Sequence, residues 1–265
     1  MPVLGFTRAT TADAHFAACR ATYLDLLGRV GIRPGDSVLD AGCGTGSFLP
    51  ALTGLVGPDG RVTGLDLVRE NVEQAAHRTA ALPCPVDVDR GSVLSLPYPD
   101  GSFDVAWCAN LTQCLGDGEL RTALAELRRV VRTGGLVAVK DLDATLVTVR
   151  PGDPFLLTDF FRAAGATPGY AARLLRTRDL YRWLREAGLA DVVQSTVLSE
   201  HVAPLSAEEL AYYGPSFASA ATRAPALGVP GAWEPLLDPA DHRNPLRSQD
   251  TYVSEGNVLA VGRVG

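Results

Sequence analysis

The stretch VLDAGCGTG, residues 38–46, decides the fold of this 265-residue chain. A short apolar run ends in Asp40, and Gly42, Gly44 and Gly46 follow it at alternating positions. Glycines let a backbone turn tightly and approach a ligand closely, because no Cβ atom stands in the way. Residues 47–56 can then form a helix. The stretch therefore predicts a strand, a glycine loop and a helix, the first unit of an α/β sheet.

The spacing of the three glycines limits the class of ligand that this loop could bind. A dinucleotide fingerprint needs G-x-G-x-x-G, whereas here the third glycine comes one residue early and Ser47 stands at the expected place. A P-loop needs a Lys-Ser/Thr pair after its glycines, and none follows. Asp66 ends the next predicted strand, where a carboxylate can accept hydrogen bonds from both hydroxyls of a ribose. The pattern thus favours a nucleoside-containing ligand other than NAD or a nucleotide triphosphate.

Strands and helices alternate along residues 36–141, which predicts a parallel sheet with a ligand crevice at the carboxyl ends of its strands. The expected strands are 37–40, 61–66, 86–89, 103–108 and 136–140, followed later by 192–201 and 257–264. The expected helices are 9–30 (one or two helices), 47–56, 69–82, 119–131 and 178–188. We expect a doubly wound, mostly parallel, seven-stranded Rossmann-like sheet with an antiparallel last strand, helices on both faces and helical cap insertions.

Four segments follow from this pattern. Lead-in or cap helices occupy 1–35, the cofactor-binding core 36–144, and a Pro- and Gly-rich cap insertion 145–177. The rest of the core sheet occupies 178–265, with a second excursion at 206–249.

Composition limits the class of protein and of partner. The net charge of −6 and the pI of about 5.2 disfavour binding to nucleic acid. The five cysteines are odd in number and form no CxxC pair, so we expect no disulfide framework and no metal site. The N-terminal residues lack a signal-peptide pattern, and no apolar run approaches the ~20 residues of a membrane span. These features predict a cytoplasmic protein without a membrane segment.

Three stretches in this order and spacing resemble the class I S-adenosylmethionine (SAM) dependent methyltransferases, in particular the small-molecule methyltransferases of type 11, which are UbiE-like. Residues 38–46 resemble motif I of that superfamily. Residues 91–104 (GSVLSLPYPDGSFD) are similar to its segment leading into the fourth strand, and residues 126–135 (ELRRVVRTGG) to its helix and turn before the fifth. The resemblance implies SAM as cofactor and S-adenosylhomocysteine as product.

The resemblance also implies roles for residues at the matching positions. The neighbourhood of Asp40 with the glycine loop would hold the methionine end of the cofactor, and Asp66 would bind the ribose. Leu67 would flank the adenine. Ser92 stands where many relatives have an Asp that accepts from the adenine amino group, and Val93 would offer a backbone N–H. The full cofactor-binding set is Asp40, Gly42, Gly44, Gly46, Asp66, Leu67, Ser92, Val93, Asn110 and Gln113.

The chemistry that the resemblance implies is in-line methyl transfer. An SN2 step on an activated sulfonium methyl mainly requires an acceptor lone pair at a near-attack separation of roughly 3 Å, in a water-poor site. A general base is needed only if the acceptor arrives protonated. Asp143 is the first candidate base and His15 the second, with Asp141 and His201 as further candidates. Tyr170, Tyr212 and Tyr213 could line an acceptor pocket, and Cys43 is expected to pack rather than react.

The acceptor class follows from what the chain lacks. An Asn/Asp-Pro-Pro-aromatic motif of amino-methylating DNA enzymes is missing after the fourth strand, as is the Pro-Cys nucleophile of cytosine enzymes. We therefore expect an enzyme of class EC 2.1.1.- that methylates an O, N or C atom of a small molecule such as a secondary metabolite. A protein or tRNA methyltransferase, or a SAM-binding cyclase or interaction module that transfers no methyl group, are the alternatives. The acceptor, the use of a base, the role of the caps and a homodimer stay open.

Overall fold

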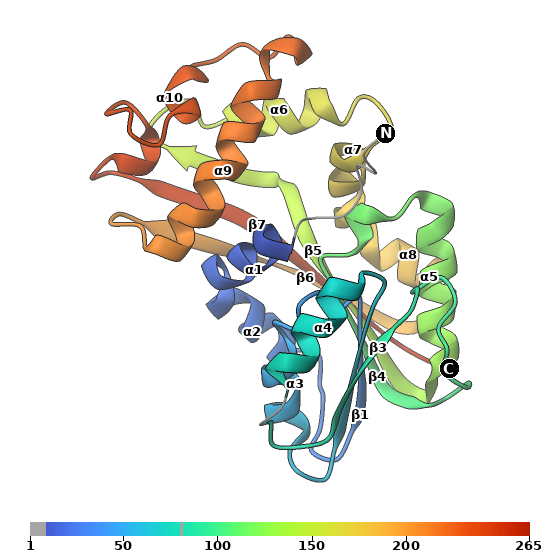
Figure 1. Cartoon of the computed structure of the whole chain (residues 1–265). Coiled ribbons are helices and arrows are strands. Elements are labelled where there is room, and N and C mark those ends of the chain that lie inside the picture. Colours follow the sequence, from blue (N-terminus) through green and yellow to red (C-terminus); the bar gives the residue numbers. More distant parts are fainter. Residues whose placement is uncertain (1–8, 80–81) are drawn as a thin grey trace. The chain divides into compact units, whose positions relative to one another are not determined.

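The computed structural model describes residues 9–79 and 82–265 (Figure 1). Residues 1–8 of the lead-in segment and residues 80 and 81 of the expected helix 69–82 lie outside this range. The strands are β1 (Ser37–Ala41), β2 (Arg61–Asp66), β3 (Val86–Arg90), β4 (Phe103–Ala109), β5 (Val131–Arg150), β6 (Ala190–Val202) and β7 (Tyr252–Arg263). The longer helices are α1 (Ala9–Ala18), α2 (Arg20–Gly28), α3 (Leu49–Val56), α4 (Arg69–Arg78), α5 (Asp117–Val130), α6 (Leu156–Ala164) and α9 (Ala207–Arg223). Shorter helices are α7 (Tyr170–Leu175), α8 (Leu180–Glu186) and α10 (Glu234–Leu237).

The seven strands form one sheet in the order β3-β2-β1-β4-β5-β7-β6. Strands β1 to β5 pair in parallel, with Asp40 of β1 opposite Trp107 of β4. Strand β7 runs antiparallel to β5, since the start of β5 bonds to the residue after the end of β7: Gly134 N–H donates to Val264 O and Val264 N–H to Gly135 O. The sheet is therefore mixed, as expected, with the reversal confined to its last strands.

The chain divides into two compact units. Of the described residues, the first comprises 9–23, 142–177 and 196–257, and the second 24–79, 82–141, 178–195 and 258–265. We call them the helical unit and the core unit. The sequence boundaries between them fall inside α2, β5, β6 and β7 and inside the 3-10 turn Arg176–Asp179.

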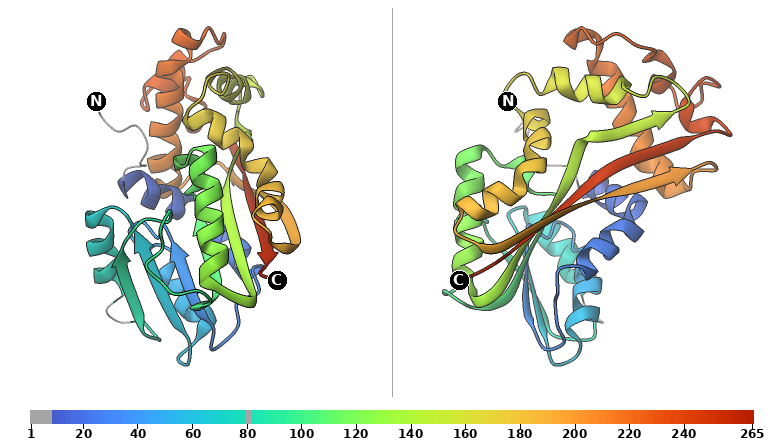
Figure 2. Two further views of the ribbon diagram at one scale, coloured as in Figure 1. Left: turned by 90° about the vertical axis from the view of Figure 1, so that its right-hand side faces the viewer. Right: turned by 180° about the vertical axis from the view of Figure 1, so that it is seen from behind.

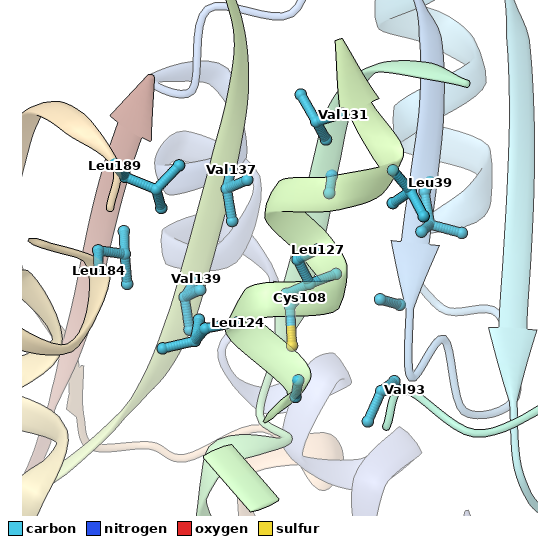
Figure 3. Close-up of a cluster of buried hydrophobic side chains, with 14 of the residues drawn as sticks. Leu39, Val93, Cys108, Leu124, Leu127, Val131, Val137, Val139, Leu184 and Leu189 are labelled. Carbon is cyan, nitrogen blue, oxygen red and sulfur yellow. The ribbon is translucent and has the colours of Figure 1, made fainter. Parts of the chain in front are cut away.

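The core unit is held together by a continuous apolar cluster on one face of its strands. Leu39 and Val139 from the strands meet Leu124 and Leu127 of α5, and Leu184 of α8 packs on the same cluster (Figure 3). Helices α3 and α4 lie against the other face of β1 to β3 (Figures 1 and 2). Apolar residues of α5 recur at helical spacing, which is why this helix buries one stripe and exposes arginines on the other. The layer of helices on each face holds the glycine loop and the strand ends in fixed positions.

The helical unit is built around α9. A capping box starts this helix: Ser206 accepts from Glu209 N–H and the Glu209 side chain accepts from Ser206 N–H. Helices α1 and α10 both contact α9, and α6 contacts α7. The buried face of α9 carries Tyr213 and Phe217.

The largest difference from the sequence-based expectation is the length of β5. We expected a strand over 136–140, whereas β5 runs to Arg150. Asp141 and Asp143 are therefore mid-strand residues and do not lie where the strand ends. Both aspartates are fully buried. No helix within residues 9–79 and 82–265 has the length and apolarity needed to cross a membrane.

Candidate functional site

The glycine loop leaves β1 exactly where parallel strands end, and its residues lie in the core unit. Gly44 has a φ of +56°, and a Cβ atom added there would meet nothing within 4 Å, so this turn of backbone faces open space. Gly46 is required for close packing of the neighbouring helices. Its Cβ would lie 2.9 Å from Leu49 Cδ1 and 3.0 Å from Ala75 Cβ, so a glycine is needed for α3 and α4 to pack closely beneath the loop.

Asp66 ties the glycine loop to the end of β2. One carboxylate oxygen accepts from Gly44 N–H at 2.9 Å, and the other accepts from Val68 N–H at 2.9 Å and from Asn71 Nδ2 at 3.1 Å. A carboxylate offers about four acceptor positions, so three are used by the protein. Asp66 is only partly buried. Its position therefore leaves acceptor capacity for a hydroxyl group of a ligand.

Asp40 is a buried carboxyl group whose pKa differs strongly from its ordinary value. Its side chain is 1% exposed, and its Oδ2 has no hydrogen-bond partner among the described residues. Burial, and secondly the nearby charge of Asp66, raises the pKa of the Asp40 carboxyl to about 8. A buried carboxyl with a bare oxygen is costly unless a cation or donor completes it.

Two further buried polar atoms without a described partner lie on neighbouring elements. Trp107 Nε1 belongs to the β4 residue opposite Asp40, and Gln113 Oε1 comes from the turn after β4. Sequence reasoning missed Trp107, because a tryptophan inside a strand reads as core packing. The signal that could have found it is its register opposite Asp40. Two acceptor oxygens, Asp40 Oδ2 and Gln113 Oε1, and one donor, Trp107 Nε1, are therefore buried without a described hydrogen-bond partner. This combination fits a ligand that carries both an amino and a carboxylate group.

The segment after β4 positions the remaining expected contacts. Asn110 has a φ of +54°, and its Oδ1 accepts from Lys140 Nζ at 2.8 Å. Its carbonyl accepts from Gln113 Nε2 at 2.7 Å. Lys140 is fully buried. The side chain and the carbonyl of Asn110 are thus both hydrogen-bonded within the protein. Gln113 uses its amide nitrogen for one of these bonds, and its Oε1 can accept from a ligand.

The residues expected to flank the adenine lie on the next loops of the core unit. Leu67 is 46% exposed, unusual for a leucine beside a strand end and suited to covering an apolar ring. Ser92 Oγ accepts from Leu94 N–H at 3.2 Å, and Val93 is buried. The Ser92 hydroxyl therefore stabilises its own turn, and whether it also contacts adenine stays a prediction.

The candidate bases fall into different environments. Asp141 Oδ2 accepts from both the N–H and the hydroxyl of Thr112, so this carboxylate fixes the turn after β4. Asp143, in the helical unit, accepts at Oδ1 from the N–H and the hydroxyl of Thr145. The ring of His201 is held by Glu209, at 2.7 Å from its Nδ1.

His15, also in the helical unit, has two oxygen neighbours. Its Nε2 lies 2.8 Å from Glu255 Oε1 and 2.9 Å from the Tyr23 hydroxyl. Sequence reasoning missed Glu255, which is 240 residues away in the chain. Tyr212 stacks on the His15 ring at 4.0 Å. Burial keeps the pKa of the Tyr212 phenol well above its usual value, so this tyrosine stays neutral.

Cys43 is a packing residue, as expected. It is 8% exposed, and a Cβ atom on Gly64 would lie 3.1 Å from its Sγ. Burial and the charge of Asp40 raise the pKa of the Cys43 thiol far above its ordinary value. The thiolate that a nucleophile needs is therefore disfavoured.

Comparison with known proteins agrees with this geometry. Residues 38–135 match the family model described as a methyltransferase domain. A 37.1 kDa protein from a transposon of Streptomyces fradiae is 42% identical over 132 residues, which are 50% of this chain and 37% of that protein. A demethylmenaquinone methyltransferase of Staphylococcus aureus is 29% identical over 158 residues, 60% of this chain and 62% of the enzyme. The chain thus spans less than two thirds of the length of these curated relatives.

The fold has solved counterparts along nearly its whole length. The crystal structure of a Bacillus halodurans protein, 14% identical, superposes with a TM-score of 0.59 over 92% of this chain and 98% of that one. The matched segment 38–135 contains the glycine loop, Asp66 and the turn after β4, and the bare polar atoms around Asp40 suit the amino-acid end of the cofactor. Residues 38–135 therefore match a methyltransferase domain, and the site that they contain suits S-adenosylmethionine as its cofactor.

Proposed function

We propose that this protein transfers a methyl group from SAM to an O, N or C atom of a small molecule. The observation that carries the proposal is the buried Asp40 carboxyl with its bare oxygen beside a glycine loop that faces open space. Bound SAM supplies an activated sulfonium methyl group. Asp40 and Gln113 would hold its methionine end, and Asp66 its ribose.

A cavity in the helical unit supports a small acceptor. Its volume is about 730 Å³, within the roughly 300–1,000 Å³ typical of small-molecule sites. The lining is mostly apolar and includes Leu205, Leu210, Gly214, Pro215 and Leu246. The expected acceptor-lining tyrosines, Tyr170, Tyr212 and Tyr213, do not belong to this lining. The cavity favours an acceptor with an apolar body.

We propose two groups as the general base that removes the proton if the acceptor arrives protonated. Asp143 comes first: its Oδ1 is engaged by Thr145, which fixes the orientation of the buried carboxylate. His15 comes second, because Glu255 and Tyr23 already face the ring nitrogen that would take the proton. A base role for His15 therefore requires this contact to open.

One experiment separates the proposed function from its alternatives. The protein is incubated with SAM carrying an isotopically labelled methyl group and with a size-fractionated cell extract. We expect label in the low-mass fraction, with an equal amount of S-adenosylhomocysteine formed. Label in proteins or tRNA would instead support macromolecular methylation. Stoichiometric SAM binding with no S-adenosylhomocysteine in any fraction would support a non-methylating cyclase or binding module.

A further inference from the structure

Three side chains of the helical unit bring nitrogen, sulfur and oxygen donors to one point. They are His15 of α1, Cys19 directly after α1, and Glu255 of β7. His15 Nε2, Cys19 Sγ and a Glu255 carboxylate oxygen all lie within 4.8 Å of one another. Cys19 and Glu255 are each 1% exposed, and the His15 side chain is 12% exposed. The cluster is thus shielded from water.

The helix places two of the donors together. His15 and Cys19 are four residues apart, and Cys19 N–H donates to His15 O at 3.0 Å, so helical geometry continues through both. Residues at this spacing project from the same helix face. Glu255 approaches from β7, with its Oε1 at 2.8 Å from His15 Nε2 and 3.3 Å from Cys19 Sγ. Two elements far apart in sequence therefore supply one donor set.

The hydrogen bonds within this cluster do not match the number of donors and acceptors that it contains. His15 Nε2 faces two oxygens, those of Tyr23 and Glu255, while a ring nitrogen carries at most one proton. Glu255 Oε1 in turn contacts His15 Nε2 and Cys19 Sγ, and it accepts a hydrogen bond from Asn257 Nδ2 at 3.2 Å. Asn257 is fully buried, and its Oδ1 has no hydrogen-bond partner among the described residues. Three donor atoms therefore converge on one carboxylate oxygen of Glu255.

We propose that His15, Cys19 and Glu255 form a binding site for a divalent transition-metal ion, with zinc as the best match. Imidazole nitrogen, thiolate sulfur and carboxylate oxygen are the three donor types that zinc takes in proteins. At zinc distances of about 2.0–2.3 Å, tetrahedral ligand atoms lie roughly 3.3–3.6 Å apart. The cluster reaches this geometry if His15 and Glu255 separate by about half an ångström and if His15 Nε2 and Cys19 Sγ, which lie within 4.8 Å, move closer together. Asn257 orients the carboxylate from outside, as second partners of metal ligands do.

The donor set also predicts the kind of site. Three protein ligands leave the fourth tetrahedral position for one further donor atom, and the Tyr23 hydroxyl already lies 2.9 Å from His15 Nε2. Zinc would occupy the Nε2 atom that a base role for His15 needs, so the two roles exclude each other. The sequence pattern H-x-x-x-C lacks the paired cysteines of zinc ribbons, and for this reason no metal site was expected from the sequence.

The test uses metal ions alone, without cofactor or acceptor. Purified full-length protein is stripped with chelator and dialysed against zinc, and bound metal is measured by elemental analysis. Cobalt(II) then serves as a spectroscopic probe, since a thiolate ligand gives a charge-transfer absorption in the near ultraviolet. We expect one zinc per chain and a thiolate-cobalt band.

The variants assign the ligands. Cys19→Ser should abolish the cobalt band, and Glu255→Gln, which keeps the shape of the side chain, should weaken zinc binding at least tenfold. Cys114→Ser in the core unit and His242→Ala, whose side chain is 92% exposed, are the matched controls and should bind as the parent does. If Cys19→Ser fails to fold, Glu255→Gln and the cobalt spectrum of the parent decide the matter. Substoichiometric zinc in the parent, a cobalt spectrum without a thiolate band, or equal loss in the controls would overturn the proposal. None of these readouts depends on methyl transfer.

Discussion

Substitution of Asp40 by Asn should uncouple cofactor binding from pH. With a pKa of about 8, the buried Asp40 carboxyl is mostly protonated at pH 7, and its ionised fraction rises about fifty-fold between pH 6 and pH 8. The cationic methionine end of SAM favours the ionised form. Binding should therefore release close to one proton at pH 7, and the Kd of the parent should fall by up to about fifty-fold over this range.

Isothermal titration calorimetry measures both quantities. Kd is determined at pH 6, 7 and 8, and proton release from the binding heats in buffers of different ionisation enthalpy. SAM has a titrating amino group of its own, which contributes equally to the parent and to Asp40→Asn. The difference between the two proteins therefore isolates Asp40. Equal pH slopes in both would show that Asp40 does not ionise on binding and would refute the reasoning.

The same pKa predicts a stability change with a definite sign. The folded-state pKa of Asp40 is raised above the ordinary value of 3.8, so the native protein holds this proton more tightly than the unfolded chain does. Stability without cofactor should fall as pH rises from about 4 towards 8, by up to about 5 kcal/mol from this group, and level off above. Asp40→Asn should lose this slope and melt at a higher temperature than the parent at pH 8.

Three further substitutions test other parts of the site. Asp66→Ala should weaken SAM binding well over tenfold, because a charged hydrogen-bond partner contributes about 1.5–3 kcal/mol, and an unchanged Kd would remove Asp66 from the site. Gly214→Leu should fill the cavity, since a Cβ there meets nothing within 4 Å, and abolish binding of the fluorescent probe anilinonaphthalene sulfonate. Gly54→Leu on α3 is its control: both should raise the melting temperature, because leucine is better than glycine in helices by about 1 kcal/mol, but only Gly214→Leu should lose the probe. Asp143→Asn should slow methyl transfer if Asp143 is the base; a full rate at every pH would eliminate it.

The cofactor half of the protein could be predicted from sequence because its information is local. Strand, glycine loop and helix follow one another within residues 37–56, and Asp66 ends the next strand. The parallel order then follows from the handedness of βαβ units. Even the antiparallel last strand was expected, and the pairing of Gly134 with Val264 confirms it.

Other features could not be predicted because their causes are distant contacts. Asp141 and Asp143 suggested the end of a strand, since isolated aspartates usually mark turns. In the structure Thr112 satisfies one and Thr145 the other, so the strand continues through both. The partnership of His15 with Glu255 spans almost the entire chain, and no sequence spacing encodes it. Cofactor-binding contacts of Ser92, Val93 and Leu67 stay predictions.

Lys140 has a practical consequence for studying this protein. It is the only lysine in the sequence, and its amine is buried and hydrogen-bonded to Asn110 in the turn that follows β4. Reagents that acylate lysine amines can therefore reach this side chain only when the turn opens. The rate at which Lys140 becomes acylated would report, at a single position and without an introduced label, how often the turn after β4 opens to solvent.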